Sequence, residues 1–189
     1  MALKSTVFRA KLAVADTDRH YYAEHVLTLA RHPSETDERM MVRLLAFALY
    51  ADERLEFGRG LSAADEPALW LKDYSGAVKL WIEVGLPDER ALKKAAGRAE
   101  RVVVLAYGGR AVDVWWGKEG PALGRLANLT VLAVEPAQSA ALEALAERGM
   151  DLQCTIQEGH VWITDGADTV AVEPRPLLGD RPGRFAGGG

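Results

Sequence analysis

One stretch decides the fold: residues 65–94, which read DEPALWLKDYSGAVKLWIEVGLPDERALKK. Aliphatic residues in its second half alternate with polar or aromatic ones, the period of a β-strand, in the series Val78-Lys79-Leu80-Trp81-Ile82-Glu83-Val84-Gly85. Residues 68–73 alternate in the same way, and Ser and Gly between the two runs favour a turn. The stretch therefore predicts a β-hairpin, and the Pro-Asp-Glu run at 87–89 predicts a helix over 88–99.

The alternation also predicts which residues of the hairpin lie opposite one another. If Asp73 pairs with Val78, then Ala68 lies opposite Glu83. This register keeps the aliphatic side chains of both strands on one face, namely Leu69, Leu71, Val78, Leu80, Ile82 and Val84. A shift by one residue would mix the faces, so we expect Trp70 and Trp81 to share the opposite face with Glu83.

Three acidic residues gather at one end of this hairpin. Glu66 falls opposite Gly85, close to Glu83, and Asp65 precedes it. Neighbouring carboxylates repel each other unless a cation offsets their charge, and Mg²⁺ takes oxygen ligands. Asp65, Glu66 and Glu83 thus form a candidate metal site. The alternative is that Glu83 is a half-exposed strand residue paired with Lys79 or Arg90, a common surface arrangement.

Lys94 and Glu38 are two further charged residues placed near the hairpin by predicted helices. Lys94 lies at the edge of the apolar stripe of the helix over 88–99, where it either leans toward Glu83 or is a solvated lysine. Ser34 predicts the start of a helix over 35–50, which puts Glu38 on the buried side of its first turn. A carboxylate there needs a partner, so Glu38 either pairs with a base such as Arg39 or Arg43 or faces a site.

Composition and charge limit the class of protein. The 189 residues suit one domain with a normal apolar core, expected over residues 1–174, and the segment rich in Pro, Gly and Arg over 175–189 predicts a flexible tail. A net charge of −4 argues against a surface that coats nucleic acid, and a single cysteine excludes an internal disulfide. We see no signal peptide and no membrane-length apolar run, so we expect a cytoplasmic protein without membrane contact.

The remaining elements surround the hairpin. Residues 5–15 and 21–31 predict two N-terminal strands, and residues 151–172 predict a small antiparallel meander. Residues 101–107 (RVVVLAY) form a nearly continuous apolar run, typical of a buried parallel strand. The predicted fold class is therefore α/β, with a mixed sheet and additional strands at the N- and C-termini.

The order helix, strand, hairpin, helix, buried strand corresponds to the αβββαβ core of the PD-(D/E)XK nuclease-like fold. Over nearly its whole length the sequence also resembles the bacterial YaeQ family, in the stretches LARHPSETDERMMVRLLA (29–46), DEPALW (65–70), LWIEVGLPDER (80–90) and LQCTIQEG (152–159). The resemblance implies a variant of this restriction endonuclease-like fold and no established activity. Ala68 stands where the nuclease motif has Asp, and Gly85 stands where it has Lys.

Displaced groups can in principle replace those two motif residues. Glu38, Asp65, Glu66, Glu83 and Lys94 are then the candidate catalytic residues, expected to converge in one cleft. Asp65, Glu66 and Glu83 would bind Mg²⁺ for phosphodiester hydrolysis of nucleic acid, and Lys94 would position the nucleophile. The alternatives are a catalytically inactive nucleic-acid-binding protein and a protein-interaction module. A nucleic-acid binder needs a basic rim, for which the candidates are Arg39, Arg43, Lys72, Lys79, Arg90 and Lys94.

Overall fold

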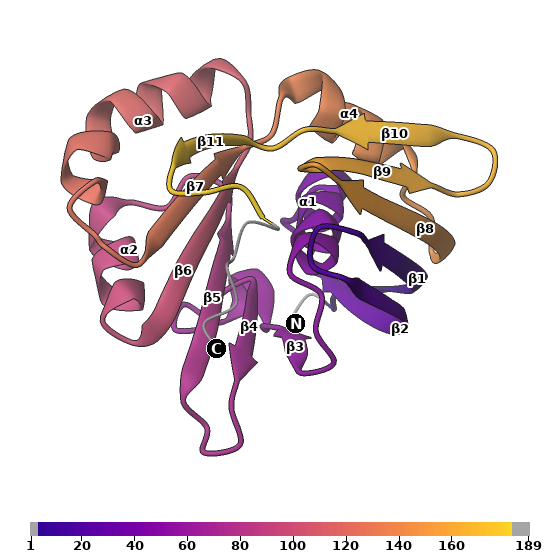
Figure 1. Cartoon of the computed structure of the whole chain (residues 1–189), viewed down its shortest axis with the longest axis horizontal. Helices are drawn as coiled ribbons and strands as arrows, with labels where there is room; N and C mark the ends of the chain where they lie inside the picture. The colour runs from indigo at the N-terminus through magenta and orange to yellow at the C-terminus, as the bar shows by residue number, and fades with distance from the viewer. Residues whose placement is uncertain (1–3, 183–189) are drawn as a thin grey trace.

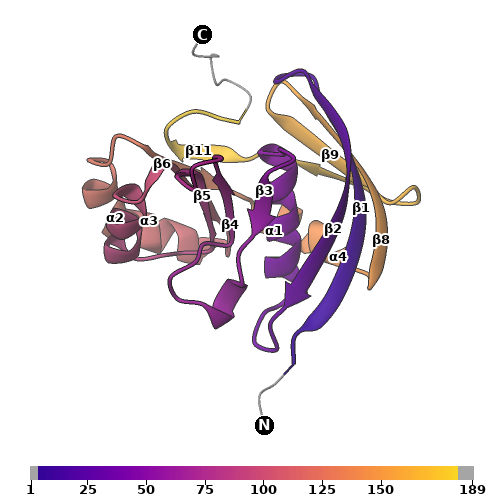
Figure 2. The same cartoon turned by 90° about the horizontal axis from the view of Figure 1, so that it is seen from below.

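A computed structural model of the chain describes residues 4–182. These residues form two mixed β-sheets and four α-helices arranged in alternating layers, as Figures 1 and 2 show. The central sheet has the strand order β11-β7-β6-β5-β4-β3. The outer sheet has the order β10-β9-β8-β1-β2. Helices α1 (Asp37–Leu49) and α4 (Pro136–Ala144) lie between the two sheets, and α2 (Glu89–Ala96) and α3 (Arg110–Leu123) cover the far face of the central sheet.

The central sheet contains the predicted hairpin. Its strands are β3 (Leu55–Phe57), β4 (Leu69–Lys72), β5 (Val78–Val84), β6 (Ala99–Ala106), β7 (Leu129–Ala133) and β11 (Arg175–Leu178). Leu69 pairs with Ile82 and Trp70 with Trp81, so the predicted register is confirmed and Ala68 lies next to Glu83. At the turn Val78 pairs with Lys72 instead of Asp73. The Asp73 carboxylate accepts hydrogen bonds from the backbone N–H groups of Ser75 and Ala77, which draws this residue into the turn.

Both faces of the central sheet are covered. Leu80, Ile82 and Val84 pack into a large core shared with α1 and the outer sheet. Trp81 packs into a second core beneath α2 and α3, where its ring lies 6.0 Å from that of Trp70. Strands β6 and β7 pair in parallel, and both carry apolar side chains on the two faces because helices cover each face of the sheet. The continuous apolar run at 101–107 had predicted this for β6.

The outer sheet joins elements from opposite ends of the chain. It consists of β1 (Thr6–Asp16), β2 (Tyr21–Arg31), β8 (Gly149–Gln157), β9 (His160–Thr164) and β10 (Thr169–Val172). The N-terminal hairpin and the C-terminal meander were both predicted, but not as one sheet. They are united by parallel pairing of β1 with β8. Inner residues such as Leu12 and Leu152 are fully buried against α1 and α4, whereas the outward face is open.

Three boundaries differ from the sequence prediction. The helix predicted over 88–99 ends at Ala96, and Ala99 already begins β6. Thr36, not Ser34, caps α1, because the Ser34 hydroxyl lies 2.7 Å from the His32 ring while the Thr36 hydroxyl accepts the Arg39 N–H at 3.1 Å. The segment expected to be a tail begins with strand β11, and its residues 183–189 lie outside the described part of the chain. Across residues 4–182, no helix is both long and apolar enough to cross a membrane.

Candidate functional site

Glu83 is the least compensated of the predicted site residues. It lies near the carboxyl end of β5, half-buried, with Val104 of β6 opposite it. The Trp81 indole N–H donates a hydrogen bond of 2.8 Å to the Glu83 carboxylate. Burial raises the pKa of Glu83, and this hydrogen bond and the charge of Arg39 only partly oppose the rise. A carboxyl group with a raised pKa is typical of functional sites as well as of buried structural acids.

Glu38 lies on the first turn of α1, where it contacts α4. The Ser139 hydroxyl donates a hydrogen bond of 2.7 Å to the Glu38 carboxylate. The nearby Tyr107, at the end of β6, hydrogen-bonds the Thr36 side chain, and burial raises the pKa of Tyr107. A polar group therefore lies at the start of α1, and it consists of Thr36, Glu38, Arg39, Tyr107 and Ser139. The positive charge of Arg39 lowers the pKa values of both Tyr107 and Glu83, against the larger effect of burial.

The basic residues expected to pair with Glu38 bind Glu35 instead. Arg43 donates through Nε and Nη2 to the two oxygens of Glu35, at 2.7 and 2.9 Å, and Arg39 donates to Glu35 at 2.7 Å. Arg43 is 1 % exposed, and it also reaches the Ala30 carbonyl of β2 at 3.3 Å. The sequence prediction did not include Glu35 as a partner of these arginines. The spacing of four residues between Glu35, Arg39 and Arg43 could have indicated that they lie on one side of the chain and pair.

Asp65 and Glu66 are each neutralised by a neighbouring base. Lys94 Nζ lies 2.7 Å from Asp65 Oδ1, and both side chains are more than half exposed. Arg59 contacts Glu66 through its backbone N–H and its Nε, both at 2.9 Å. Hydrogen bonds from Lys94 and from Arg59 lower the pKa values of Asp65 and Glu66, respectively. Lys94 is thus directed to Asp65, and the structure does not bring it to Glu83.

Asp65 and Lys94 pair with each other, whereas Glu38, Glu66 and Glu83 each bind a different donor, so the five predicted residues do not form one hydrogen-bonded group. Among residues 4–182, no three His, Cys, Asp or Glu side chains are arranged to hold a metal ion. As arranged here, Asp65, Glu66 and Glu83 do not fit the Mg²⁺ that the sequence resemblance implies, because a cation bound by Asp65 and Glu66 would have to displace Lys94 and Arg59.

Four of the six basic residues expected to form a rim, Arg39, Arg43, Lys79 and Lys94, are ion-paired with an acid of the chain. Lys79 lies 2.8 Å from Glu100, Lys94 pairs with Asp65, and Arg43 is buried with Glu35. The Lys72 amine lies over the Trp70 ring, 3.6 Å from its centroid. Lys72 keeps its charge in this contact, and Arg90 is exposed with no ion pair among residues 4–182, so two of the six candidates could still contact phosphates.

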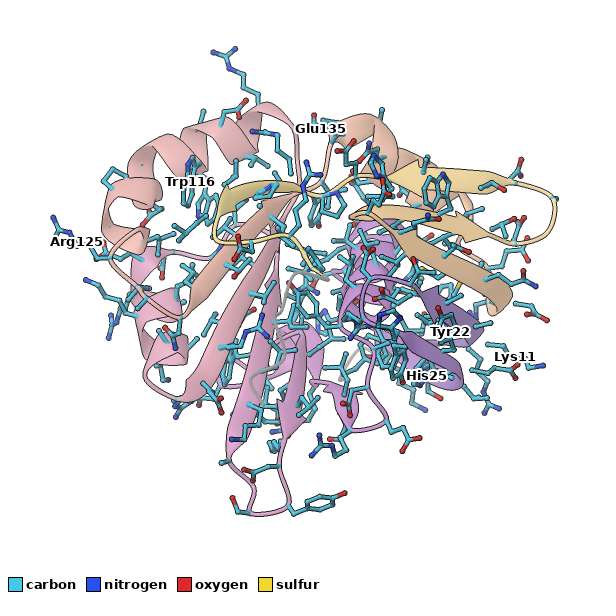
Figure 3. All side chains as sticks on the ribbon, in the orientation of Figure 1. Lys11, Tyr22, His25, Trp116, Arg125 and Glu135 are labelled. Carbon is cyan, nitrogen blue, oxygen red and sulfur yellow. The ribbon has the colours of Figure 1, made fainter. Side chains whose placement is uncertain are left out.

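A depression of about 250 Å³ opens where β6 and β7 end and the chain turns to α3 on one face and α4 on the other. Arg110, Asp113, Glu135 and Arg175 line it, and Gly109 begins α3 beside it with a positive φ of 64°. Its two acids and two arginines balance in charge, and Arg175 lies 3.4 Å from Glu135. None of the five predicted site residues lines this depression. Figure 3 shows Glu135 at this end of the molecule.

Comparisons with known proteins agree on one family. The family model described as "YaeQ protein" matches residues 1–174. An "Uncharacterized protein YaeQ" of Salmonella typhi is 49 % identical over 173 residues, which are 92 % of this chain and 96 % of that protein. The Escherichia coli K12 protein of that name is also 49 % identical, over 91 % of this chain and 95 % of its own.

Two solved structures share the fold. The crystal structure of the YaeQ protein from Xanthomonas axonopodis pv. citri has a TM-score of 0.90 at 51 % identity, and the match covers 93 % of this chain and 99 % of that one. The YaeQ protein from Pseudomonas syringae has a TM-score of 0.88 at 44 % identity, over 94 % and 98 % of the two chains.

Proposed function

The chain belongs to the YaeQ family, and from the arrangement of its charges we propose that it is a nuclease-like protein without metal-dependent catalysis, which acts by binding another protein. In this proposal, α1, β3, β4, β5, α2 and β6 are the αβββαβ core of a PD-(D/E)XK-like domain. One observation carries it: the acids expected to share a cation each bind a different donor of the protein. Asp65 pairs with Lys94, Glu66 with Arg59, and Glu83 accepts the Trp81 N–H.

A protein partner is favoured over nucleic acid by charge. Nucleic-acid binding draws most of its affinity from free lysines and arginines that neutralise phosphates. Lys79 and Arg43, two candidates for such a rim, are instead occupied by Glu100 and Glu35. The outward face of the outer sheet, in contrast, exposes four large apolar side chains, Val7, Tyr22, Val26 and Trp162, and we assign the protein partner to this sheet.

Mg²⁺-dependent phosphodiester hydrolysis is the second candidate, and Glu83 is the residue that favours it. This carboxylate has no ion pair among the described residues, and burial raises its pKa. It also occupies the position of the acid in the nuclease motif that the sequence resembles. Isothermal titration of Mg²⁺ and Mn²⁺ into the protein separates the two candidates.

We expect no saturable metal binding and no cleavage of single- or double-stranded DNA or RNA oligonucleotides in either metal. Glu83→Gln should give the same traces as the unmodified chain. The matched control is Glu100→Gln, which removes one exposed acid on β6 whose ion pair in the described structure is with Lys79. Saturable binding and metal-dependent cleavage that are lost in Glu83→Gln but kept in Glu100→Gln would replace our proposal with the nuclease function.

A further inference from the structure

The two sheets have four edge strands among the described residues, and only one of them is long. β3 has three residues, β10 has four, and β11 has four with a register shift and Pro176, which has no N–H. β2 has 11 residues, Tyr21–Arg31, and pairs along its whole length with β1 on one side only. Short strands, prolines and bulges are the usual protection against edge-to-edge pairing. β2 has none of them.

The free edge of β2 leaves hydrogen-bonding capacity unused. Within residues 4–182, the backbone groups of residues 21–29 form no backbone hydrogen bond with any segment other than β1. Val26 and Tyr22, on its outward face, are 77 % and 63 % exposed. The inward side chains Tyr21, Ala23 and His25 are only half-buried, so this end of the strand extends beyond the core. Figure 3 shows Tyr22, His25 and Lys11 together at this border of the outer sheet.

The sequence of β2 is complementary to itself when a second copy runs antiparallel. Val26 is the midpoint of Tyr21–Arg31, so a register centred on it uses the whole strand. Val26 then meets Val26, Tyr22 meets Ala30, and Glu24 meets Thr28. A register centred on Glu24 would instead oppose two carboxylates, which is unfavourable in a sheet.

Charge favours the same register. On β1, Arg9 pairs with Thr28 and Lys11 pairs with Val26, and all four side chains point to the open face. Glu24 of the second copy would lie beside Thr28, about 10 Å across the sheet from Arg9 at a strand spacing of about 4.8 Å. Long arginine and lysine side chains span that distance, so each Glu24 would face two bases of the other copy.

We propose that two copies of this chain pair through the β2 edge, antiparallel about a two-fold axis at Val26, and so merge their outer sheets into one continuous sheet. A two-fold axis gives a closed dimer, because the same edge is used by both copies. The second strand also covers Tyr21, Ala23 and His25, which the core leaves half-exposed. This inference rests on the proposed protein-binding function and names the partner.

Sedimentation equilibrium of the full chain over a range of concentrations tests the proposal. We expect a monomer–dimer equilibrium that Val26→Lys weakens at least about tenfold in Kd, because it places two ammonium groups at the axis. The matched control is Val7→Lys, which adds the same charge to the same open face on the interior strand β1, where Val7 is 44 % exposed. It should leave the equilibrium unchanged.

Cross-linking gives a second readout that does not depend on how well the lysine variants fold. The cysteine of the described chain, Cys154, is buried, so an introduced thiol reports its own surroundings. Val26→Cys should form a disulfide-linked dimer under mild oxidation, and Val7→Cys should remain a monomer. A monomer at all concentrations, a dimer that Val26→Lys leaves intact, or an edge that binds only extended peptides of other proteins would each overturn the proposal. Metal-dependent cleavage would overturn the proposed function instead.

Discussion

The two sheets of this protein pack against the same helices, but they satisfy their polar groups very differently. The central sheet is covered on both faces, and the charged residues near its hairpin are paired internally: Asp65 with Lys94, Glu66 with Arg59. The outer sheet is covered on one face and ends in β2, a long strand with a free edge. The difference teaches that the hairpin region, where the sequence predicted a site, binds most of its charged groups internally, and that the unpaired backbone edge lies on the outer sheet.

Helix α1 connects the two sheets, and its buried ion pair offers the largest effect. Arg43 binds both oxygens of Glu35 and also the Ala30 carbonyl of β2. Arg43→Met leaves the Glu35 carboxylate buried with less compensation, which typically costs about 3–5 kcal/mol of unfolding free energy. We expect that loss in urea denaturation, as a single transition, because one core contains residues of both sheets.

The double variant Glu35→Leu with Arg43→Met is the control for this prediction. Replacing both members of a buried pair by apolar residues is often nearly neutral, so it should recover most of the stability lost in Arg43→Met. A double variant as unstable as the single one would assign the effect to packing of the Arg43 side chain. Two separate unfolding transitions would show that the sheets do not share one cooperative core.

Glu83 gives a smaller effect, confined to the central sheet. Its folded-state pKa is raised from 4.5 by burial, so the charged form is disfavoured in the folded protein. The stability linked to the neutral form is present below pH 4.5 and is lost as the pH rises through the folded pKa. Glu83→Gln should therefore unfold at higher urea concentration than the unmodified chain at pH 7, and the difference should vanish below pH 4.5.

The amide oxygen that Glu83→Gln introduces can still accept the Trp81 N–H, so this substitution changes the charge with little change in contacts. Glu100→Gln, in an exposed ion pair with Lys79, serves as the comparison. If Glu83→Gln is instead less stable than the unmodified chain at pH 7, the carboxylate is stabilised by a group that the described structure does not place beside it.

Sequence reasoning predicted the elements of the central sheet well and the pairing of its charged residues poorly, for one physical reason. The period-two pattern of residues 78–85 admits a single register that keeps the aliphatic face together, so Ala68 beside Glu83 followed directly. Ion pairs have no such period. Whether Lys94 reaches Asp65 or Glu83 depends on the rotamers of a long, exposed side chain and on a loop, residues 58–68, whose path the sequence does not determine.

The outer sheet was missed as a unit for a related reason. The β1–β2 hairpin and the β8–β10 meander are local structures, and each was predicted from its own alternation and turns. The parallel pairing that unites them joins Arg9 to Gly149, and such a distant contact leaves no pattern in either segment. The free edge of β2 became visible only when the order of strands was known.

His25, on the inner face of β2, gives the smallest effect and returns to the outer sheet. Burial beside Phe47 lowers its pKa from 6.5, and the nearby Asp52 and Glu53 only partly offset this. A histidine with a lowered folded-state pKa binds protons more readily in the unfolded chain. Its contribution to the free energy of unfolding is therefore complete above pH 6.5 and decreases as the pH falls below that value. We expect His25→Leu to reduce the loss of stability that the unmodified chain shows as the pH falls below 6.5. Tyr21→Phe, which removes the hydroxyl 2.9 Å from Nε2 and keeps the ring, should retain the loss. Equal pH dependence in His25→Leu and the unmodified chain would mean that this end of β2 is as open to water as the face above it.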